Sequence, residues 1–296
     1  MKVSQRAVFF ALSAICASAS AADSDLATVE ITGGRTIVEV ETARPLGMAV
    51  MALVERFAQP ITYEDPRYVY EGDLVDVTER VRKDLDKYPP GKAPKVIGPR
   101  GGKLSVSSSS TDVAAVLDQL VQAQNSSGHG GHFRVERQGE FLHVIPTDVR
   151  DKSGNWAPQP SVLDVSISLE AEDRTALELV DTIRRAVSDA AGVKVVLGLG
   201  LSGGISTGKE PHYRLGAKNE PARSVLVRAL TAIAVDRELL TWLLFYGAAD
   251  NRYVLSLMPA FQGPQPPRTP ESSGAADAPA DAASRTQNGL SGSRSR

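Results

Sequence analysis

The chain has 296 residues, with 33 basic and 35 acidic side chains and a formal net charge of −2 at pH 7. This balance excludes the large cationic field with which proteins attract nucleic acid or anionic lipid. The single cysteine, Cys16, lies in an N-terminal segment that we expect to be removed. Disulfides, thiolate metal sites and cysteine nucleophiles are therefore excluded from the mature chain.

Residues 1–22 are typical of a secretory signal peptide. Two basic residues precede an apolar stretch that ends at Cys16, and small residues follow as far as Ala22. The stretch is too short to cross a membrane comfortably, and the bulky Ile15 before Cys16 disfavours a lipoprotein anchor. We therefore expect cleavage near Ala22 and a periplasmic or secreted protein without an integral membrane segment.

Residues 25–147 are expected to form a first α+β unit. Thr36–Glu41 alternates like a half-buried strand, and Arg44–Phe57 carries an apolar stripe at helical spacing. The other expected elements are strands at Pro60–Tyr63, Leu74–Thr78 and Lys103–Val106, a helix at Thr111–Val121, and a hairpin of His132–Glu136 and Glu140–Ile145.

Residues 161–260 repeat this order of elements after a polar, Pro- and Gly-containing linker at 148–160. Expected are strands at Val162–Leu169, Gly192–Leu197 and His212–Leu215, helices at Thr175–Val187 and from Pro221, and a hairpin of Thr241–Tyr246 and Arg252–Leu257. The predicted fold is α+β, with two similar small units, each a mixed sheet packed by two helices. The tail 261–296 is too poor in apolar residues to form a core and is expected to be disordered.

A glycine-rich stretch between the expected strands invites a nucleotide-binding interpretation. Gly198–Gly203 has the GxGxxG spacing, and Gly208–Lys209 approaches a Walker A spacing. The following Glu210 would repel phosphate, and Pro211 prevents the helix start that both motifs require. We interpret the stretch as a connection between strands and expect no cofactor.

Three histidines could gather around a metal ion. His129, His132 and His143 are close in sequence, with Glu136 or Glu140 as a possible fourth ligand. The two glycines between the first two histidines would make a poorly organised chelate, so we favour solvated side chains and predict no metal site.

An acidic and tyrosine-rich stretch at residues 63–76 is the other candidate site. It contains Tyr63, Glu64, Asp65, Tyr68, Tyr70, Asp73 and Asp76. Carboxylates of this kind could serve in acid–base catalysis or bind a sugar, but they more often face solvent from strands and turns. No GxSxG turn is present, so no catalytic residue is assigned.

The two tryptophans are expected in different surroundings. Trp242 lies in the apolar last hairpin and is predicted to be buried. Trp156 lies in the linker and is predicted to be partly exposed, where it could mark a binding surface.

Val38–Phe57 and Arg214–Leu230 resemble the short N-terminal (STN-like) domain of secretins and TonB-dependent receptors. The similar features are a strand, a helix opened by Pro-Leu, and a later helix followed by a hairpin. The resemblance implies two copies, over 25–146 and 161–260, in a stand-alone exported protein that contacts other proteins of the bacterial envelope. It supplies no catalytic residues to carry over.

These observations predict an exported, non-catalytic interaction module of the bacterial cell envelope. It is expected to bind protein partners through sheet edges or surfaces. The alternative is an exported hydrolase or carbohydrate-active protein that uses residues 63–76. Partner identity, oligomeric state and docking of the two units are left open.

Overall fold

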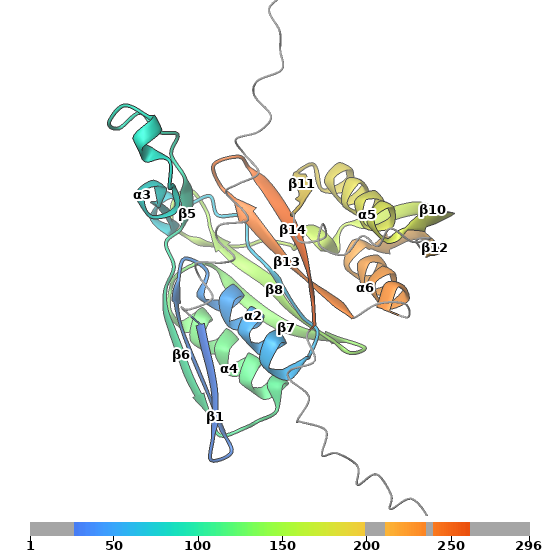
Figure 1. The fold of residues 1–296 in the computed structure, drawn as a ribbon, viewed down its shortest axis with the longest axis horizontal. Coiled ribbons are helices and arrows are strands. Elements are labelled where there is room, and N and C mark those ends of the chain that lie inside the picture. The colour runs from blue at the N-terminus through green and yellow to red at the C-terminus, as the bar shows by residue number, and fades with distance from the viewer. Residues whose placement is uncertain (1–26, 199–210, 235–238, 261–296) are drawn as a thin grey trace, which may run out of the picture. The chain divides into compact units, whose positions relative to one another are not determined.

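The computed structural model describes residues 27–198, 211–234 and 239–260, which Figure 1 shows in colour. Their contacts place them in one compact unit. Within these ranges the protein is α+β, as predicted, with helices packed on several sheets. The predicted signal peptide at 1–22, the stretch 199–210 of the glycine loop and the predicted tail at 261–296 lie outside the described residues.

The elements follow one another along the chain as they are labelled in Figure 1. The helices are α2 (Pro45–Phe57), α3 (Thr78–Val81), α4 (Val113–Ser126), α5 (Ala176–Ala191) and α6 (Ala222–Ala234). The strands of the first half are β1 (Ala27–Thr32), β2 (Arg35–Thr42), β3 (Ile61–Glu64), β4 (Leu74–Asp76), β5 (Ile97–Pro99), β6 (Gly102–Ser108), β7 (His132–Gln138), β8 (Phe141–Arg150) and β9 (Trp156–Pro158). Those of the second half are β10 (Ser166–Thr175), β11 (Lys194–Leu197), β12 (His212–Pro221), β13 (Leu240–Gly247) and β14 (Arg252–Pro259). Short 3-10 turns are η2 (Glu71–Asp73), η3 (Leu85–Lys87) and η4 (Val162–Asp164).

Local sequence signals set the ends of the longer helices. Thr175 and Glu178 form a reciprocal capping box at the start of α5, and Gly192 follows its end with a left-handed φ of 62°. Asp112 caps α4 through its side chain. α2 begins with Pro45, whose missing N–H would have no partner in the first turn. Each of these helices also buries an apolar stripe, so packing stabilises the helix in addition to its end signals.

A seven-stranded mixed sheet joins strands from both halves of the chain. Its order is β11, β14, β13, β3, β8, β7, with β9 beside β8. The junction is the parallel pair β13 and β3, where Leu244 lies opposite Glu64. Beside it, Thr241 Oγ1 donates a hydrogen bond of 2.6 Å to the carbonyl of Ile61. The ranges expected as two units therefore share one sheet.

Strand pairing follows the same pattern in both halves. In the first half β3 is parallel to β8, which is antiparallel to β7. In the second half β11 is parallel to β14, which is antiparallel to β13. Outside the central sheet, β2 pairs with β6 and β10 pairs with β12, both antiparallel. β1 adds a third strand to the first of these pairs, and β4 and β5 form a short ribbon.

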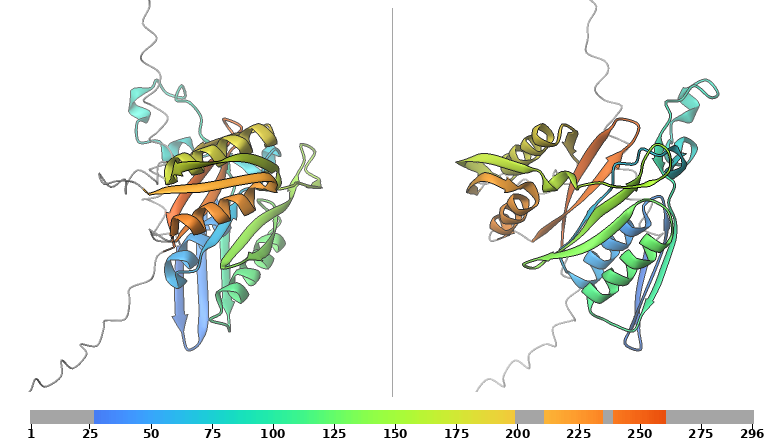
Figure 2. Two further views of the ribbon diagram at one scale, coloured as in Figure 1. Left: turned by 90° about the vertical axis from the view of Figure 1, so that its right-hand side faces the viewer. Right: turned by 180° about the vertical axis from the view of Figure 1, so that it is seen from behind.

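Each pair of helices lies between the central sheet and a small sheet. α2 and α4 contact β2 and β6 on one side and β3 and β7 on the other, and α5 and α6 contact β10, β12, β11 and β13 in the corresponding way. Figure 2 shows α5 and α6 against β10 and β12. Leu243 packs in the core of α2 and α4, whereas its neighbours Trp242 and Leu244 pack in the core of α5 and α6. Because alternate side chains of a strand point to opposite faces, the two cores lie on opposite faces of the sheet.

Residues 148–160, expected as a linker, contribute to the central sheet. β8 continues to Arg150, and β9 pairs with it so that Trp156 lies opposite Arg150. The Gln159 N–H donates to the carbonyl of Thr147 at 2.8 Å. Polar composition favoured a loop here, but pairing with an existing strand satisfies the backbone groups of this stretch. Trp156 is 38% exposed, and Trp242 is buried as predicted.

None of the helices in the described ranges is long and apolar enough to cross a membrane.

Candidate functional site

Glu64 and Asp65 lie at the end of β3, where the two halves of the chain meet. Both carboxylates are buried, each with about 1% exposure. They are adjacent residues of an extended backbone, and their side chains contact different elements on the two faces of the sheet. This part of the acidic stretch is therefore interior, not the solvent-facing surface that its composition suggested.

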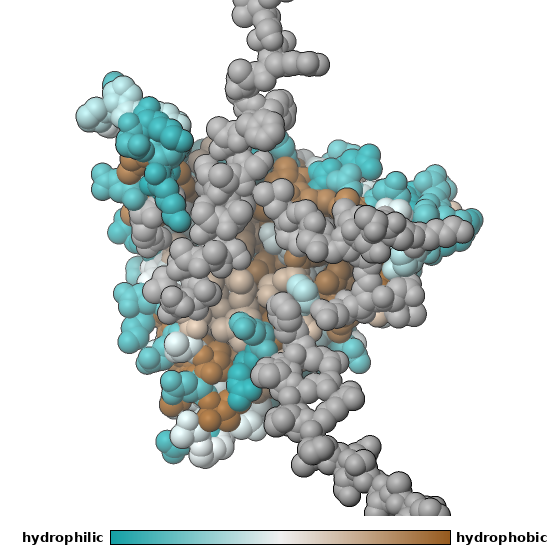
Figure 3. Space-filling view, in the orientation of Figure 1, coloured by the Kyte–Doolittle hydropathy of each residue, from teal (hydrophilic) through white to brown (hydrophobic). Residues whose placement is uncertain are grey.

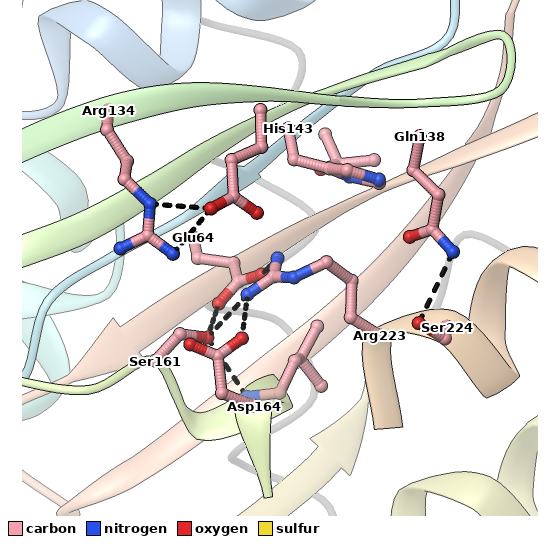
Figure 4. Close-up of polar contacts among 11 residues, drawn as sticks. Glu64, Arg134, Gln138, His143, Ser161, Asp164, Arg223 and Ser224 are labelled. Atoms are coloured by element: carbon pink, nitrogen blue, oxygen red, sulfur yellow. Dashed lines mark hydrogen bonds and ion pairs between the residues drawn. The ribbon is translucent and has the colours of Figure 1, made fainter. Parts of the chain in front are cut away.

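The Glu64 carboxylate is held by residues of the second half (Figure 4). It accepts hydrogen bonds from Arg223 of α6 and from the hydroxyl of Ser161. Arg223 Nη2 also donates to Ser161 Oγ at 2.9 Å and to Asp164 Oδ1 at 2.8 Å. Burial raises the pKa of Glu64 above its ordinary value, against the opposing effect of the Arg223 charge. These contacts join β3, the segment before β10, and α6.

The Asp65 carboxylate, like that of Glu64, accepts hydrogen bonds at both of its oxygens. Oδ2 accepts a hydrogen bond of 2.6 Å from Arg44 Nε and one of 2.9 Å from the Tyr246 N–H. Oδ1 accepts from the hydroxyl of Tyr63 at 2.8 Å, with the Tyr68 hydroxyl at 3.4 Å. Burial, followed by the charge of Asp65, raises the pKa of both phenols well above the usual range, so they stay neutral donors.

The remaining acidic residues of the stretch have their own partners. Asp73 is buried against Arg150, with Oδ1 at 3.1 Å from Nη1, and the Arg150 guanidinium lies 5.7 Å from the ring centroid of Tyr70. Asp76 accepts hydrogen bonds from the hydroxyl of Thr78 and from its backbone N–H, and these lower the pKa of Asp76. The carboxylates of Glu64, Asp65, Asp73 and Asp76 therefore contact separate partners and do not form the facing pair that a glycosidase uses.

The three candidate histidines lie apart. His143 is fully buried, and its Nδ1 lies 2.8 Å from Thr62 Oγ1. His132 stacks on Trp156 with 3.8 Å between ring centroids, while His129 contributes to the lining of a pocket. In the part of the chain that the structure describes, no group of three or more His, Cys, Asp or Glu residues is arranged to hold a metal ion.

His143 has an environment that opposes protonation. Its ring packs against those of Phe141 and Trp242, with centroid distances of 6.0 Å and 5.4 Å. Burial, helped by the charge of Arg223, lowers the pKa of His143 to about 3. The imidazole is therefore neutral at physiological pH and contributes to packing.

Only the first glycine of the glycine-rich stretch can be placed. Gly198 follows β11, and its N–H donates to the carbonyl of Leu255 in β14 at 2.8 Å. Residues 199–210 lie outside the described residues, so the nucleotide-binding question is not tested there.

Both edges of the central sheet are closed at one residue by side chains. At the β7 edge, Asn125 of α4 donates to the carbonyl of Phe133 at 2.9 Å and accepts from its N–H at 2.8 Å. At the β11 edge, Ser188 Oγ accepts from the Val195 N–H at 3.0 Å, and Arg184 donates to its carbonyl at 2.6 Å. These side chains occupy the backbone groups that an added strand would need at Phe133 and at Val195.

The edges of the smaller sheets differ from one another. β10 and β12 have irregular register, and Arg174 and Arg228 donate to the carbonyls of Glu170 and Gly216 within them. Within the described ranges, β1 pairs with β2 on one side and with no strand on the other. Its register is continuous over six residue pairs. The outer edge of β6 is also unpaired there, but it carries Lys103, and lysine on an edge discourages pairing.

The sequence analysis did not identify the residues that pair with Glu64 and Asp65 or the residue that covers the β7 edge. Arg223 lies 159 residues from Glu64, and Arg44 lies 21 residues from Asp65, so no spacing connected them. Asn125 offered no clear signal, because the same helix carries three other amide side chains, those of Gln119, Gln122 and Gln124.

Comparisons with family models, curated proteins and solved structures give no match for this chain.

Proposed function

We propose that the protein is an exported, non-catalytic interaction module of the bacterial cell envelope, which binds a protein partner by strand addition to β1. The observation that carries the proposal is the contrast between sheet edges. Side chains cover the backbone of one residue on each edge of the central sheet, whereas the outer edge of β1 has no pairing strand among the described residues. Strand addition supplies affinity through backbone hydrogen bonds and specificity through alternate side chains.

β1 has the properties of a strand that accepts a partner. It contains no proline, lysine or bulge, which are the usual devices that protect an edge. Ala27 and Val29 pack on the core, while Ile31 is 36% exposed. Figure 3 shows hydrophobic residues over the lower part of this face, around the position of β1 and α2 in Figure 1. An added strand would cover apolar surface as well as backbone groups.

We also infer that the two halves are copies of one STN-like unit, each a mixed sheet packed by two helices. The shared pairing pattern of β2, β3, β6, β7 and β8 with β10, β11, β12, β13 and β14 supports this proposal. Export to the periplasm or beyond, through the signal peptide at 1–22, stays a prediction from the sequence.

The alternative, an exported hydrolase or carbohydrate-active protein using residues 63–76, has less support. Glu64 and Asp65 are each occupied by their own donors and contact opposite faces of the sheet. General acid–base catalysis needs groups that reach a common substrate.

Site-specific crosslinking tests the proposed function. Because Cys16 is the only cysteine and lies in the predicted signal peptide, single-cysteine variants of the mature chain are straightforward. Glu30→Cys on β1 and Arg137→Cys on β7, both at exposed positions, would each carry a photoactivatable maleimide. We expect envelope fractions to yield one discrete protein adduct from the β1 position and none from the β7 position. Equal adducts from both, or none from β1, would contradict strand addition at this edge.

A further inference from the structure

A pocket of about 420 Å³ lies in the first half of the chain. Its walls are the start of α2, the start of β6, the end of α4 with the loop that follows it, and the rings of Tyr63, Tyr68 and Phe133. This volume is within the range of small-molecule sites. The pocket is separate from the proposed β1 edge.

The charges that line the pocket have one sign. Arg44 and Lys103 are the charged residues of the lining, His129 lies in the lining with them, and no carboxylate contributes to it. Arg44 Nε donates a hydrogen bond to Asp65, and Arg44 Nη2 donates one of 2.8 Å to the carbonyl of Tyr246. Among the described residues, Nη1 of Arg44 has no hydrogen-bond partner and Lys103 makes no ion pair. Asp65 offsets part of the positive charge, but it also fixes the guanidinium in place.

The rim of the pocket is held rigidly. Gly101 has a φ of +41°, and a Cβ there would lie 2.0 Å from the Thr42 carbonyl oxygen, so only glycine fits. On the other side, Gln124 Nε2 donates to the carbonyl of His129 at 2.8 Å. Arg150 donates to the carbonyl of Gly128 in the same loop. A preformed site loses less entropy when a ligand binds.

The floor of the pocket is aromatic. The rings of Tyr63 and Phe133 stack with 5.7 Å between centroids. The Tyr63 hydroxyl is engaged with Asp65, which leaves mainly ring carbon to face a ligand. The site therefore combines a cationic rim with an apolar floor.

We propose that this pocket binds a carboxylate attached to a short apolar group. The acidic end of an extended peptide and a small organic acid share this chemistry. The carboxylate would be recognised by the free edge of the Arg44 guanidinium together with Lys103 and His129, and the apolar group would lie on the tyrosine floor. The site would add a second binding function to the module.

Isothermal titration calorimetry on the mature chain tests the proposal with three probes: N-acetyl-Leu-Phe with a free carboxylate, its C-terminal amide, and phenylacetate. We expect the free-acid peptide to bind roughly tenfold or more tightly than the amide, because charge-assisted hydrogen bonds are lost in the amide. Phenylacetate binding as tightly as the peptide acid would identify a small acid as the ligand source, and binding of the peptide acid alone would identify a peptide end. Equal binding of acid and amide, or no binding of either acid probe in the millimolar range, would overturn the proposal.

Matched variants locate the binding site. Lys103→Gln combined with His129→Gln should weaken binding of the tightest acid probe by roughly tenfold, and both side chains are exposed, so folding should be preserved. Lys92→Gln removes an exposed lysine that does not line the pocket, and should leave binding unchanged. An equal loss in both variants would show a non-specific charge effect and would also overturn the proposal.

Discussion

At the scale of single residues, Arg223 supplies the counter-charge for the buried Glu64 carboxylate. Arg223→Met would leave that carboxylate with the Ser161 hydroxyl as its main partner. We expect the free energy of unfolding to fall by about 3–5 kcal/mol at pH 7, as when one member of a buried ion pair is removed. Urea unfolding measures this change. The control is Arg228→Met, which removes an exposed pair with Glu220 and should cost about 1 kcal/mol or less. Similar losses in the two variants would refute the role assigned to Arg223.

His143 gives a prediction about pH. Its pKa is lowered to about 3 in the folded protein, whereas an unfolded histidine has a pKa of about 6.5. The unfolded chain therefore binds the proton more readily, and the stability due to neutral His143 is complete above about pH 6.5 and is lost as the pH falls toward 3. By pH 4.5 the loss should be about 2–3 kcal/mol.

The variant His143→Gln isolates this effect from the other acid-sensitive groups. Urea unfolding at pH 7 and pH 4.5 should show a smaller pH-dependent difference in the variant than in the parent chain. The same pH dependence in both proteins would mean that His143 titrates normally.

The acidic stretch was recognisable from the sequence at the residue scale, but its purpose was not. From composition, Glu64 and Asp65 were expected to face solvent at a strand end or in a turn. Their burial depends on Arg44 and Arg223, and these become neighbours only when the central sheet forms. Long-range ion pairs leave no local signal in a single sequence.

At the scale of elements, Asn125 should protect the β7 edge. Asn125→Ala removes both hydrogen bonds to the Phe133 backbone, and we expect a loss of about 1–2 kcal/mol in the free energy of unfolding. It should also speed hydrogen exchange of the Phe133 amide. Gln122→Ala, on the exposed side of the same helix, is the control and should change neither quantity appreciably. Unchanged exchange at Phe133 in Asn125→Ala would show that the amide does not close this edge.

Helical periodicity predicted α2, α4, α5 and α6 because each buries a regular apolar stripe. β1 and β9 were not predicted. β9 is a three-residue strand in a polar segment, and it is stabilised by pairing with β8 more than by its own side chains. Edge strands of this kind depend on a neighbouring strand, so their sequences carry little pattern of their own.

At the scale of the whole molecule, the continuous sheet should make the described halves unfold together. The β13 and β3 pairing, the Glu64–Arg223 contact and the Asp65 contact with the Tyr246 backbone all cross between halves. Urea unfolding followed by tryptophan fluorescence and by far-ultraviolet circular dichroism should therefore give coincident transitions. Two separated transitions would show that the halves are independent.

The order of the elements that form the two cores followed from the sequence, but β1, α3, β5, β9 and the common sheet did not. The pairing of β13 with β3 joins strands about 180 residues apart in the chain, and apolar alternation does not specify which edge a strand joins. The polar composition of residues 148–160 also predicted a linker that separates the two halves. The backbone of this segment instead pairs within the central sheet.

The central claim is that side chains cover each edge of the large sheet at one residue, whereas the outer edge of β1 is open to a partner. Residue-resolved hydrogen exchange on the mature chain without added partner tests it most directly. The outward amides of Phe133 and Val195, which are bonded to Asn125 and Ser188, should exchange at least roughly tenfold more slowly than the outward-facing amides of β1. Comparable exchange at the three edges, or protection along the whole of β1, would contradict the claim.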